Sequence, residues 1–363
     1  MADTIPGAAV MKPCVLLTGS RGAPPNLDIP PGIRSIRVNE RALPLGLIHE
    51  IRSSLAPLHF VMAVGGGTVM DAAKALLSLQ AAEWPTYVDL IPTTFGTGSE
   101  VTRFATVYDI EGRKQSVLLP ASTMVRVHYR PELLCTLPDL EVRAGFCDAF
   151  AHCFESLWAR NATPESVELA TAGMRIGMKI LHNWGSRTDE HFRALQNMGR
   201  LGGQAISLTK TTAAHALSYE WTQKWSIPHG FAAAAALPSL HSFCRDRAPG
   251  QRSLWIQARA MGARNPAEVH DHLLHVIQFL IPADVRWRLS QAIRSGRVQA
   301  PCPDRLANFP MVLSPSLINQ LDGQTAMDLD VNACSAFVIK QEGGAGDGMR
   351  ITPPAEPMNP ACP

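Results

Sequence analysis

The segment from residue 60 to residue 77 constrains the fold more than any other part of the sequence. Its first residues, Phe60 to Val64, are all apolar, and three consecutive glycines, Gly65 to Gly67, follow them. The next residues have helical composition, with Thr68 as the candidate N-cap. A buried strand that passes through glycines into a helix is the repeating unit of parallel α/β sheets. The segment therefore predicts a parallel α/β domain.

The same turn predicts a phosphate site. Glycines let the backbone approach a pyrophosphate, and the first N–H groups of the helix complement its charge. A tight turn that needs positive φ is the alternative explanation for the glycines. A second loop, Pro92 to Thr102, follows another predicted strand and is rich in small residues and hydroxyls. Two such loops at strand ends favour a dinucleotide as the ligand.

The periodicity of the chain changes after about residue 137. Before it, short apolar runs at 14–17, 60–64 and 88–91 predict strands, and after it long helical patterns dominate. One of these helices has Thr163 as its predicted N-cap and Pro164 as its first residue. We therefore predict an α/β domain followed by an all-helical one, with a tail rich in Gly and Pro. The three ranges are 1–137, 138–342 and 343–363.

Composition narrows the class of protein. The 363 residues are 46% hydrophobic and 18% charged, with a net charge of +2, so no nucleic-acid or membrane partner is expected. The eight cysteines form no CxxC pair, which predicts reduced thiols and a cytoplasmic protein. An uncharged stretch, Trp225 to Cys244, is interrupted by prolines and histidines, so we expect a buried loop and helix there.

Four side chains form a candidate metal site. Asp148 and His152 are four residues apart, which places them on one helix face, and His215 and His229 lie in apolar surroundings farther along. One carboxylate and three neutral imidazoles suit a divalent cation such as Fe2+ or Zn2+. Each histidine alone would more often be a satisfied core residue, but the set of four favours a metal.

Together these segments resemble the iron-dependent alcohol dehydrogenase family, whose fold is that of dehydroquinate synthase. Residues 65–71 resemble its GGGS-x-x-D element, residues 92–102 its PTT-x-GTGSEVT element, and Asp148 and His152 its D-x-x-x-H metal pair. The resemblance implies a Rossmann-like α/β domain followed by a helical metal-binding domain. It also implies iron, NADPH or NADH, an aldehyde or alcohol substrate, and a homodimer.

The resemblance also implies roles for individual residues. Asp148, His152, His215 and His229 would hold the metal. Residues implied to bind the cofactor are Gly19, Gly66, Gly67, Thr68, Asp71, Thr93, Thr94, Ser99 and Lys114. Many family members have an aspartate where this chain has Gly19, followed by Ser20 and Arg21, which favours NADPH.

The segment from Lys210 to Tyr219 indicates the substrate. It is similar to the KTT-x-x-HA-x-SY run of phosphonoacetaldehyde reductases. Lys210 and Thr211 would bind a phosphonate, with Arg103 as a second candidate. The proton donor would be a water-linked ribose hydroxyl of the cofactor or a nearby side chain such as Tyr219. We therefore expect reduction of phosphonoacetaldehyde to 2-hydroxyethylphosphonate.

Two other functions fit the same motifs. One is a broad alcohol dehydrogenase for neutral substrates, in which Lys210 is a solvated cation at a helix end. The other is a non-catalytic nucleotide-binding relic, suggested by the short segment between Gly19 and Gly65 and by an abbreviated helical region after Ser295. The second loop and the order of the four metal ligands favour a dehydrogenase over a lyase of the dehydroquinate synthase type.

Overall fold

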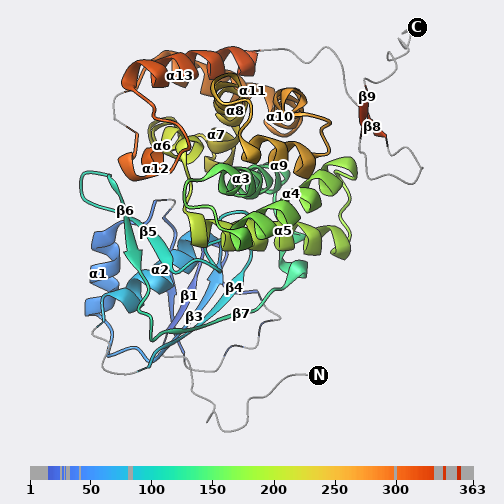
Figure 1. Ribbon diagram of the computed structural model, residues 1–363. Coiled ribbons are helices and arrows are strands. Elements are labelled where there is room, and N and C mark those ends of the chain that lie inside the picture. The colour runs from blue at the N-terminus through green and yellow to red at the C-terminus, as the bar shows by residue number, and fades with distance from the viewer. Residues whose placement is uncertain are drawn as a thin grey trace, which may run out of the picture. The chain divides into compact units, whose positions relative to one another are not determined.

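The computed structural model describes residues 15–24, 27, 29, 33–40, 42–80, 85–297, 301–330, 338–340 and 350–352 (Figure 1). The chain divides into two compact units. The first comprises Met1–Pro138 and Arg187–Gln196, and the second comprises Asp139–Ser186 and Asn197–Pro363.

The first unit contains a five-stranded parallel sheet in the order β2-β1-β3-β4-β7. The central strands are mostly apolar and buried on both faces, as parallel strands covered on both sides must be, with Asp89 of β4 as a buried charged residue. The edge strand β2 is mostly exposed. The strands are β1 (Val15–Thr18), β2 (Arg34–Arg37), β3 (Phe60–Gly65), β4 (Tyr87–Pro92) and β7 (Met124–Val127). The predicted parallel sheet is thus confirmed.

Helices α1 and α2, a hairpin and a short 3-10 helix make up the rest of this unit among the described residues before residue 138. Helix α2 (Gly67–Ser78) packs against β3 and against a hairpin of β5 (Phe104–Tyr108) and β6 (Lys114–Leu118) (Figure 1). This hairpin is antiparallel, so the unit is not built from parallel strands alone. Helix α1 (Leu45–Ser53) lies beside α2, and a short 3-10 helix, η1 (Pro131–Leu134), follows β7.

The strand order places the predicted phosphate loop at the switch point of the sheet. The chain runs from β1 to β2 on one side and then crosses to β3 on the other, so the carboxyl ends of β1 and β3 are neighbours. Gly19 follows β1, and a Cβ atom there would lie 3.7 Å from Cγ2 of Val69 in α2. Ligands of open α/β sheets bind at such a point.

The three glycines are needed for close packing and not for a positive φ angle. None of Gly65, Gly66 and Gly67 has a positive φ. A Cβ on Gly66 would lie 3.0 Å from Oγ1 of Thr94, and one on Gly67 would lie 2.8 Å from Oγ1 of Thr97. The alternative of a turn that needs positive φ is therefore wrong, and the glycines bring the two predicted loops together.

The prediction that Thr68 caps helix α2 is wrong. The N-cap is Gly66, because the N–H groups of Val69 and Met70 both donate to its carbonyl oxygen, at 3.0 and 3.1 Å. The helix therefore begins two residues earlier than predicted, and the absence of a Cβ at residue 66 lets Thr94 pack closely against the N-cap. Thr68 therefore lies in the first helical turn, where backbone N–H groups have no partner within the helix.

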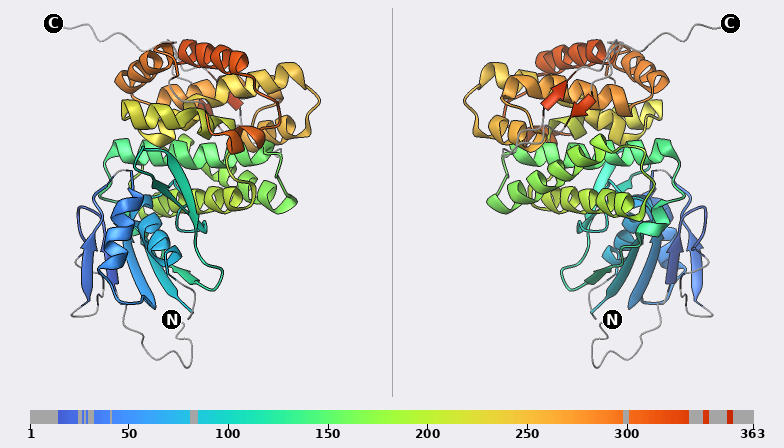
Figure 2. Two further views of the ribbon diagram at one scale, coloured as in Figure 1. Left: turned by 90° about the vertical axis from the view of Figure 1, so that its left-hand side faces the viewer. Right: turned by 90° about the vertical axis from the view of Figure 1, so that its right-hand side faces the viewer.

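The second unit is helical, and the views in Figure 2 show its helices, coloured green to orange-red, stacked in successive layers. Thr163 caps α4 through a reciprocal pair of hydrogen bonds with Ser166, as predicted. The α-helices after residue 138 are α3 (Asp139–Trp158), α4 (Pro164–His182), α5 (Asp189–Thr209), α6 (Ala213–Trp225), α7 (His229–Ala235), α8 (Leu237–Arg247), α9 (Arg252–Met261), α10 (Pro266–Leu280), α11 (Ala283–Arg294), α12 (Pro303–Ala307) and α13 (Pro315–Asp330).

Two strands occur where none was expected. β8 (Val338–Lys340), in the predicted helical range, pairs antiparallel with β9 (Arg350–Thr352), in the predicted tail. The rest of that tail, 343–349 and 353–363, lies outside the described residues. The uncharged stretch from 225 to 244 is divided among α6, α7 and α8. Across the described part of the chain, no helix combines the length and apolarity needed to span a bilayer.

A buried lysine fixes the second loop to α2. Lys74 is 1% exposed, and its Nζ donates to the carbonyl oxygens of Ser99 at 2.8 Å and Phe104 at 2.6 Å. Nζ also lies 2.9 Å from Oδ1 of Asp71, which accepts a hydrogen bond of 2.5 Å from the Ser99 hydroxyl. The other oxygen of Asp71 accepts from the N–H of Thr106. Asp71 therefore positions Ser99, and direct contact of Asp71 with a cofactor stays a prediction.

Replacing Lys74 with methionine should destabilise the protein. The partly buried Asp71 carboxylate would lose its cation, a change that costs about 3 kcal/mol in fully buried pairs and somewhat less here, because the side chain of Asp71 is 15% exposed. Lys179→Met, at an exposed position of α4, is the control and should change stability by less than about 0.5 kcal/mol. Urea unfolding followed by circular dichroism measures both. Equal stability of the two variants would contradict the role given to Lys74.

Candidate metal centre

Helix α3 provides two of the four predicted metal ligands. Every residue from Phe146 to Trp158 is buried, so this helix forms the interior of the second unit. Asp148 and His152 lie one turn apart, with Oδ1 of Asp148 3.6 Å from Nε2 of His152 and side-chain exposures of 6% and 5%. The predicted common face is therefore confirmed.

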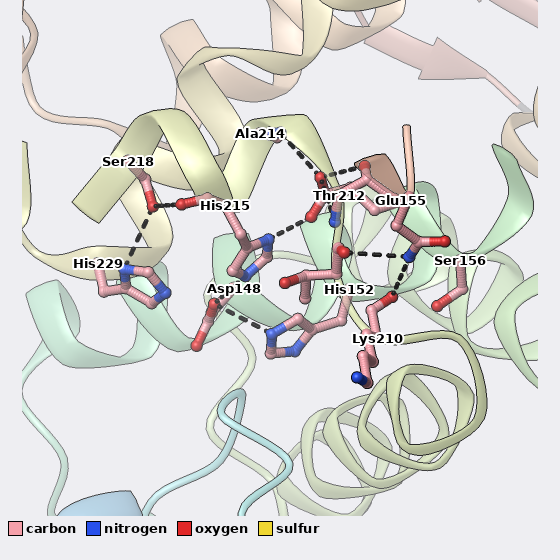
Figure 3. A network of polar contacts seen from close by, with 12 residues as sticks. Asp148, His152, Glu155, Ser156, Lys210, Thr212, Ala214, His215, Ser218 and His229 are labelled. Carbon is pink, nitrogen blue, oxygen red and sulfur yellow. Dashed lines mark hydrogen bonds and ion pairs between the residues drawn. The ribbon is translucent and has the colours of Figure 1, made fainter. Parts of the chain in front are cut away.

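Helices α6 and α7 bring the other two ligands to the same point (Figure 3). Nε2 of His215 lies 3.4 Å from Oδ1 of Asp148. Ligand atoms of Asp148, His215 and His229 all lie within 4.8 Å of one another, and the rings of His152 and His215 stack with centroids 4.7 Å apart. The donor set fits a divalent cation, because one carboxylate and two imidazoles converge in a largely buried place and the imidazole of His152 lies beside the carboxylate.

Glycine at position 230 allows His229 to reach this point. A Cβ there would lie 2.0 Å from the carbonyl oxygen of Ala144 and 2.7 Å from the backbone nitrogen of Asp148. Any larger residue would push α7 away from α3. On α5, Gly202 makes a similar approach, since its Cβ would lie 3.3 Å from Cβ of His152. We did not predict either glycine as a site residue.

Glu155 is a further site residue that the sequence analysis missed. It is fully buried, and its Oε2 accepts a hydrogen bond from Nδ1 of His215. Its Oε1 accepts from the N–H and hydroxyl of Thr212, at 3.1 and 2.5 Å, and from the N–H of Ala214 at 2.8 Å. A carboxylate on the far nitrogen of a ligand histidine fixes its tautomer and orientation. The available signal in the sequence was its position seven residues after Asp148, which places it on the same helix face two turns later.

Charge interactions among these groups shift their pKa values. Burial alone would raise the pKa of Asp148, but the neighbouring histidines, His152 first, hold it well below its usual range. Burial alone would lower the pKa of His215, yet the charge of Glu155 and the hydrogen bonds with Asp148 and Glu155 raise it. A protonated His215 cannot bind a cation, so metal and proton compete for this histidine.

The predicted substrate residues lie in two places. Lys210 and Thr211 immediately precede α6, the helix of His215, and the ring of Tyr219 on α6 stacks on that of His229, with centroids 5.8 Å apart. In the first unit, Nη2 of Arg103 donates to the carbonyl oxygens of Leu119 and Pro120, which favours a structural role.

The predicted cofactor residues of the first unit are partly brought together. Gly66 and Gly67 are packed against the second loop at Thr94 and Thr97, and the N–H of Thr93 donates to the carbonyl oxygen of Gly65. Lys114 stands at the start of β6, opposite Tyr108. Its contact with a cofactor ribose stays a prediction.

Family models confirm the resemblance found in the sequence. The model of the iron-containing alcohol dehydrogenases matches residues 48–125, and the C-terminal model of the Fe-containing alcohol dehydrogenase family matches residues 143–292. The second match includes all four predicted metal ligands. This chain belongs to the iron-containing alcohol dehydrogenase family.

Curated relatives include reductases and dehydrogenases. Phosphonoacetaldehyde reductase of Streptomyces viridochromogenes is 33% identical over 53% of this chain and 54% of its own length. The probable alcohol dehydrogenase EutG of Escherichia coli is 33% identical over 52% of this chain and 53% of its own length. The 1-propanol dehydrogenase PduQ of Salmonella typhimurium is 27% identical over 79% of this chain and 80% of its own length. The chain thus spans about half the length of the first two relatives.

Solved structures have the same fold. The iron-containing alcohol dehydrogenase of Thermotoga maritima matches with a TM-score of 0.67 at 22% identity, over 87% of this chain and 92% of its own. Sulfoacetaldehyde reductase of Bifidobacterium kashiwanohense, solved in complex with NAD+, matches with a TM-score of 0.68 at 20% identity, over 88% of this chain and 91% of its own. The predicted fold, of the dehydroquinate synthase type, is thereby confirmed.

Glu155→Gln should weaken metal binding. The amide keeps the shape of the side chain but removes the negative charge that orients His215, and comparable changes lower metal affinity roughly 10- to 100-fold. Glu165→Gln, on the exposed first turn of α4, is the matched control. Metal affinity is measured by competition with a chelator, and circular dichroism checks that both variants fold. A folded Glu155→Gln protein with unchanged affinity would refute this role.

Proposed function

We propose that this chain is a metal-dependent aldehyde reductase that uses NADPH and acts on phosphonoacetaldehyde. The convergence of Asp148, His215 and His229, with His152 3.6 Å from Asp148, in a member of an iron-containing dehydrogenase family carries the redox proposal. Fe2+ is the proposed ion, and Zn2+ would fit the same donors. When bound, the cation supplies positive charge for the substrate oxygen, and the reduced nicotinamide supplies a hydride.

The residues at the sheet switch point suit the nucleotide. N–H groups of Gly67 and Thr68 in the first turn of α2 are available to the pyrophosphate, and Thr93, Thr94 and Ser99 contribute small polar contacts. Gly19 presents no carboxylate at the end of β1 to repel a 2′-phosphate. This absence supports NADPH over NADH.

Residues of the second unit suit an anionic aldehyde. Reduction adds a hydride to the carbonyl carbon and a proton to its oxygen, and Tyr219, stacked on His229, is the proposed proton donor. Lys210 and the hydroxyl of Thr211 would bind the phosphonate. The similarity to phosphonoacetaldehyde reductase supports this substrate. A sulfoacetaldehyde reductase of Bilophila wadsworthia is 28% identical over 49% of this chain, and its name also gives an anionic aldehyde as the substrate.

A broad dehydrogenase for neutral substrates is the second candidate. Among the curated relatives described above, the match that covers most of this chain, 79%, is to a 1-propanol dehydrogenase. Such an enzyme would use the same metal ligands without a preference for a charged aldehyde.

Removal of the metal should abolish aldehyde-dependent NADPH oxidation. Chelator-treated protein is compared with protein dialysed without chelator, and Fe2+ is then restored to the treated sample. We expect activity to be lost on removal and regained on restoration, because Asp148 and its three histidines would hold the cation at the substrate oxygen. Equal rates in the stripped and untreated protein would refute the proposed mechanism, and no turnover under any condition would favour a nucleotide-binding relic.

Lys210→Ala should weaken the use of phosphonoacetaldehyde far more than that of propanal. A lost charge-assisted hydrogen bond to the phosphonate is worth about 2 kcal/mol, or roughly 30-fold in kcat/KM. Lys224→Ala, at an exposed position near the end of α6, is the control. Steady-state kinetics with both aldehydes gives the ratio, and equal losses on the two substrates would favour the broad dehydrogenase.

A further inference from the structure

Lys210 has a backbone conformation that its residue type rarely adopts. Its φ is 61°, and Ser226 is the other non-glycine residue with a positive φ in the described part of the chain. Lys210 directly follows α5, and its N–H still donates to the carbonyl oxygen of Ile206 at 2.8 Å. Glycine usually occupies this position after a helix, because other residues are strained there. A strained lysine points to a use for its side chain.

The side chain of Asn308 binds the backbone of this turn. Nδ2 of Asn308 donates to the carbonyl oxygens of Thr209 at 2.8 Å and Thr211 at 3.2 Å, and it lies 3.5 Å from that of Lys210. Asn308, Thr209 and Thr211 are all buried, so the carbonyl groups of the two threonines depend on Asn308 in place of water. The carbonyl oxygen of Lys210 also accepts a hydrogen bond of 2.8 Å from the hydroxyl of Thr209.

The position of Asn308 is itself fixed by the end of α3. The N–H of Asn161 donates to Oδ1 of Asn308 at 3.2 Å, and the N–H of Arg160 donates to its backbone oxygen at 2.9 Å. Trp158 packs edge-on against Phe309, with centroids 5.3 Å apart. The amide is therefore held in one orientation, with its NH2 group toward the turn.

The turn is also bound to the metal centre. Thr212 donates its N–H and hydroxyl to Glu155, and the hydroxyl of Thr212 accepts a hydrogen bond of 2.9 Å from Nε1 of Trp158. Figure 3 shows Lys210, Thr212 and His215 following one another along this segment beside Glu155. Its two ends are thus fixed, one by Asn308 and the other by the carboxylate that orients His215.

The ammonium group of Lys210 remains available to a ligand. Lys210 is exposed, and within the described ranges no hydrogen-bond or ion-pair partner of its Nζ occurs. Because both ends of this turn are fixed, the ammonium group can occupy only a narrow range of positions relative to His215.

We propose that Asn308 is a positioning residue that sets the preference of this site for anionic aldehydes. It holds Lys210 in the left-handed conformation and so places the ammonium group where the anionic end of the substrate binds. This inference rests on the proposed function, because it assumes that Lys210 binds substrate.

Selectivity of a double-mutant set tests the inference. The variants are Asn308→Ala, Lys210→Ala and the combination, with Asn319→Ala at an exposed position of α13 as the matched control. The readout is the ratio of kcat/KM for phosphonoacetaldehyde to that for propanal, together with bound metal. We expect Asn308→Ala to lower the ratio roughly tenfold, mainly through KM, with metal content retained and with little further loss in the double variant. Asn308→Ser, which keeps one hydroxyl donor, should give an intermediate ratio, and it replaces Asn308→Ala if that variant does not fold.

The possible results separate the two proposals. A lowered ratio in Lys210→Ala with an unchanged ratio in Asn308→Ala overturns the role of Asn308 and leaves the proposed substrate standing. Equal losses on both aldehydes in Asn308→Ala, with loss of metal, also overturn it, because Asn308 would then act on the fold alone. An unchanged ratio in Lys210→Ala refutes the phosphonate proposal and this inference with it.

Discussion

The buried carboxylate of Glu155 is the interaction on which the metal centre depends. An ionised group inside a protein is costly unless partners surround it, and Glu155 has four donors: a ring nitrogen, a hydroxyl and two backbone N–H groups. These donors all belong to the segment from Thr212 to His215. The start of α6 can therefore adopt no other position without leaving the charge unpaired, and this fixes His215 before any cation binds.

Close packing around α3 is the second requirement. Three helices approach it at glycines: Gly173 of α4, Gly202 of α5 and Gly230 of α7. A Cβ on Gly173 would lie 2.6 Å from Sγ of Cys153, so the spacing leaves no room for a methyl group. Because Cys153 and His152 are adjacent on α3, the packing that excludes side chains at these glycines also keeps the ligand face in place.

Sequence patterns predicted the parts of this protein that depend on local order. The strand ending at Gly65, the cap at Thr163 and the pair Asp148 and His152 each follow from residue spacing within one element. Glu155, Gly230 and Asn308 were missed because their roles depend on partners 57 or more positions away, such as Thr212, Ala144 and Thr209. The error at Thr68 is related, since the N-cap is Gly66, a residue without a capping side chain that packs against Thr94 of the second loop.

In the proposed site, metal binding and substrate selectivity depend on different contacts of one segment, Thr209 to His215. Glu155 acts on Thr212 to His215, whereas Asn308 acts on Thr209 to Thr211, and the two groups reach the segment from separate elements. The hydrogen bonds of Glu155 described above are made with Thr212, Ala214 and His215, and none involves residue 210. Relatives with metal ligands in common can on this basis differ in the charge of their substrates, because the turn before α6 can change without disturbing the carboxylate behind His215.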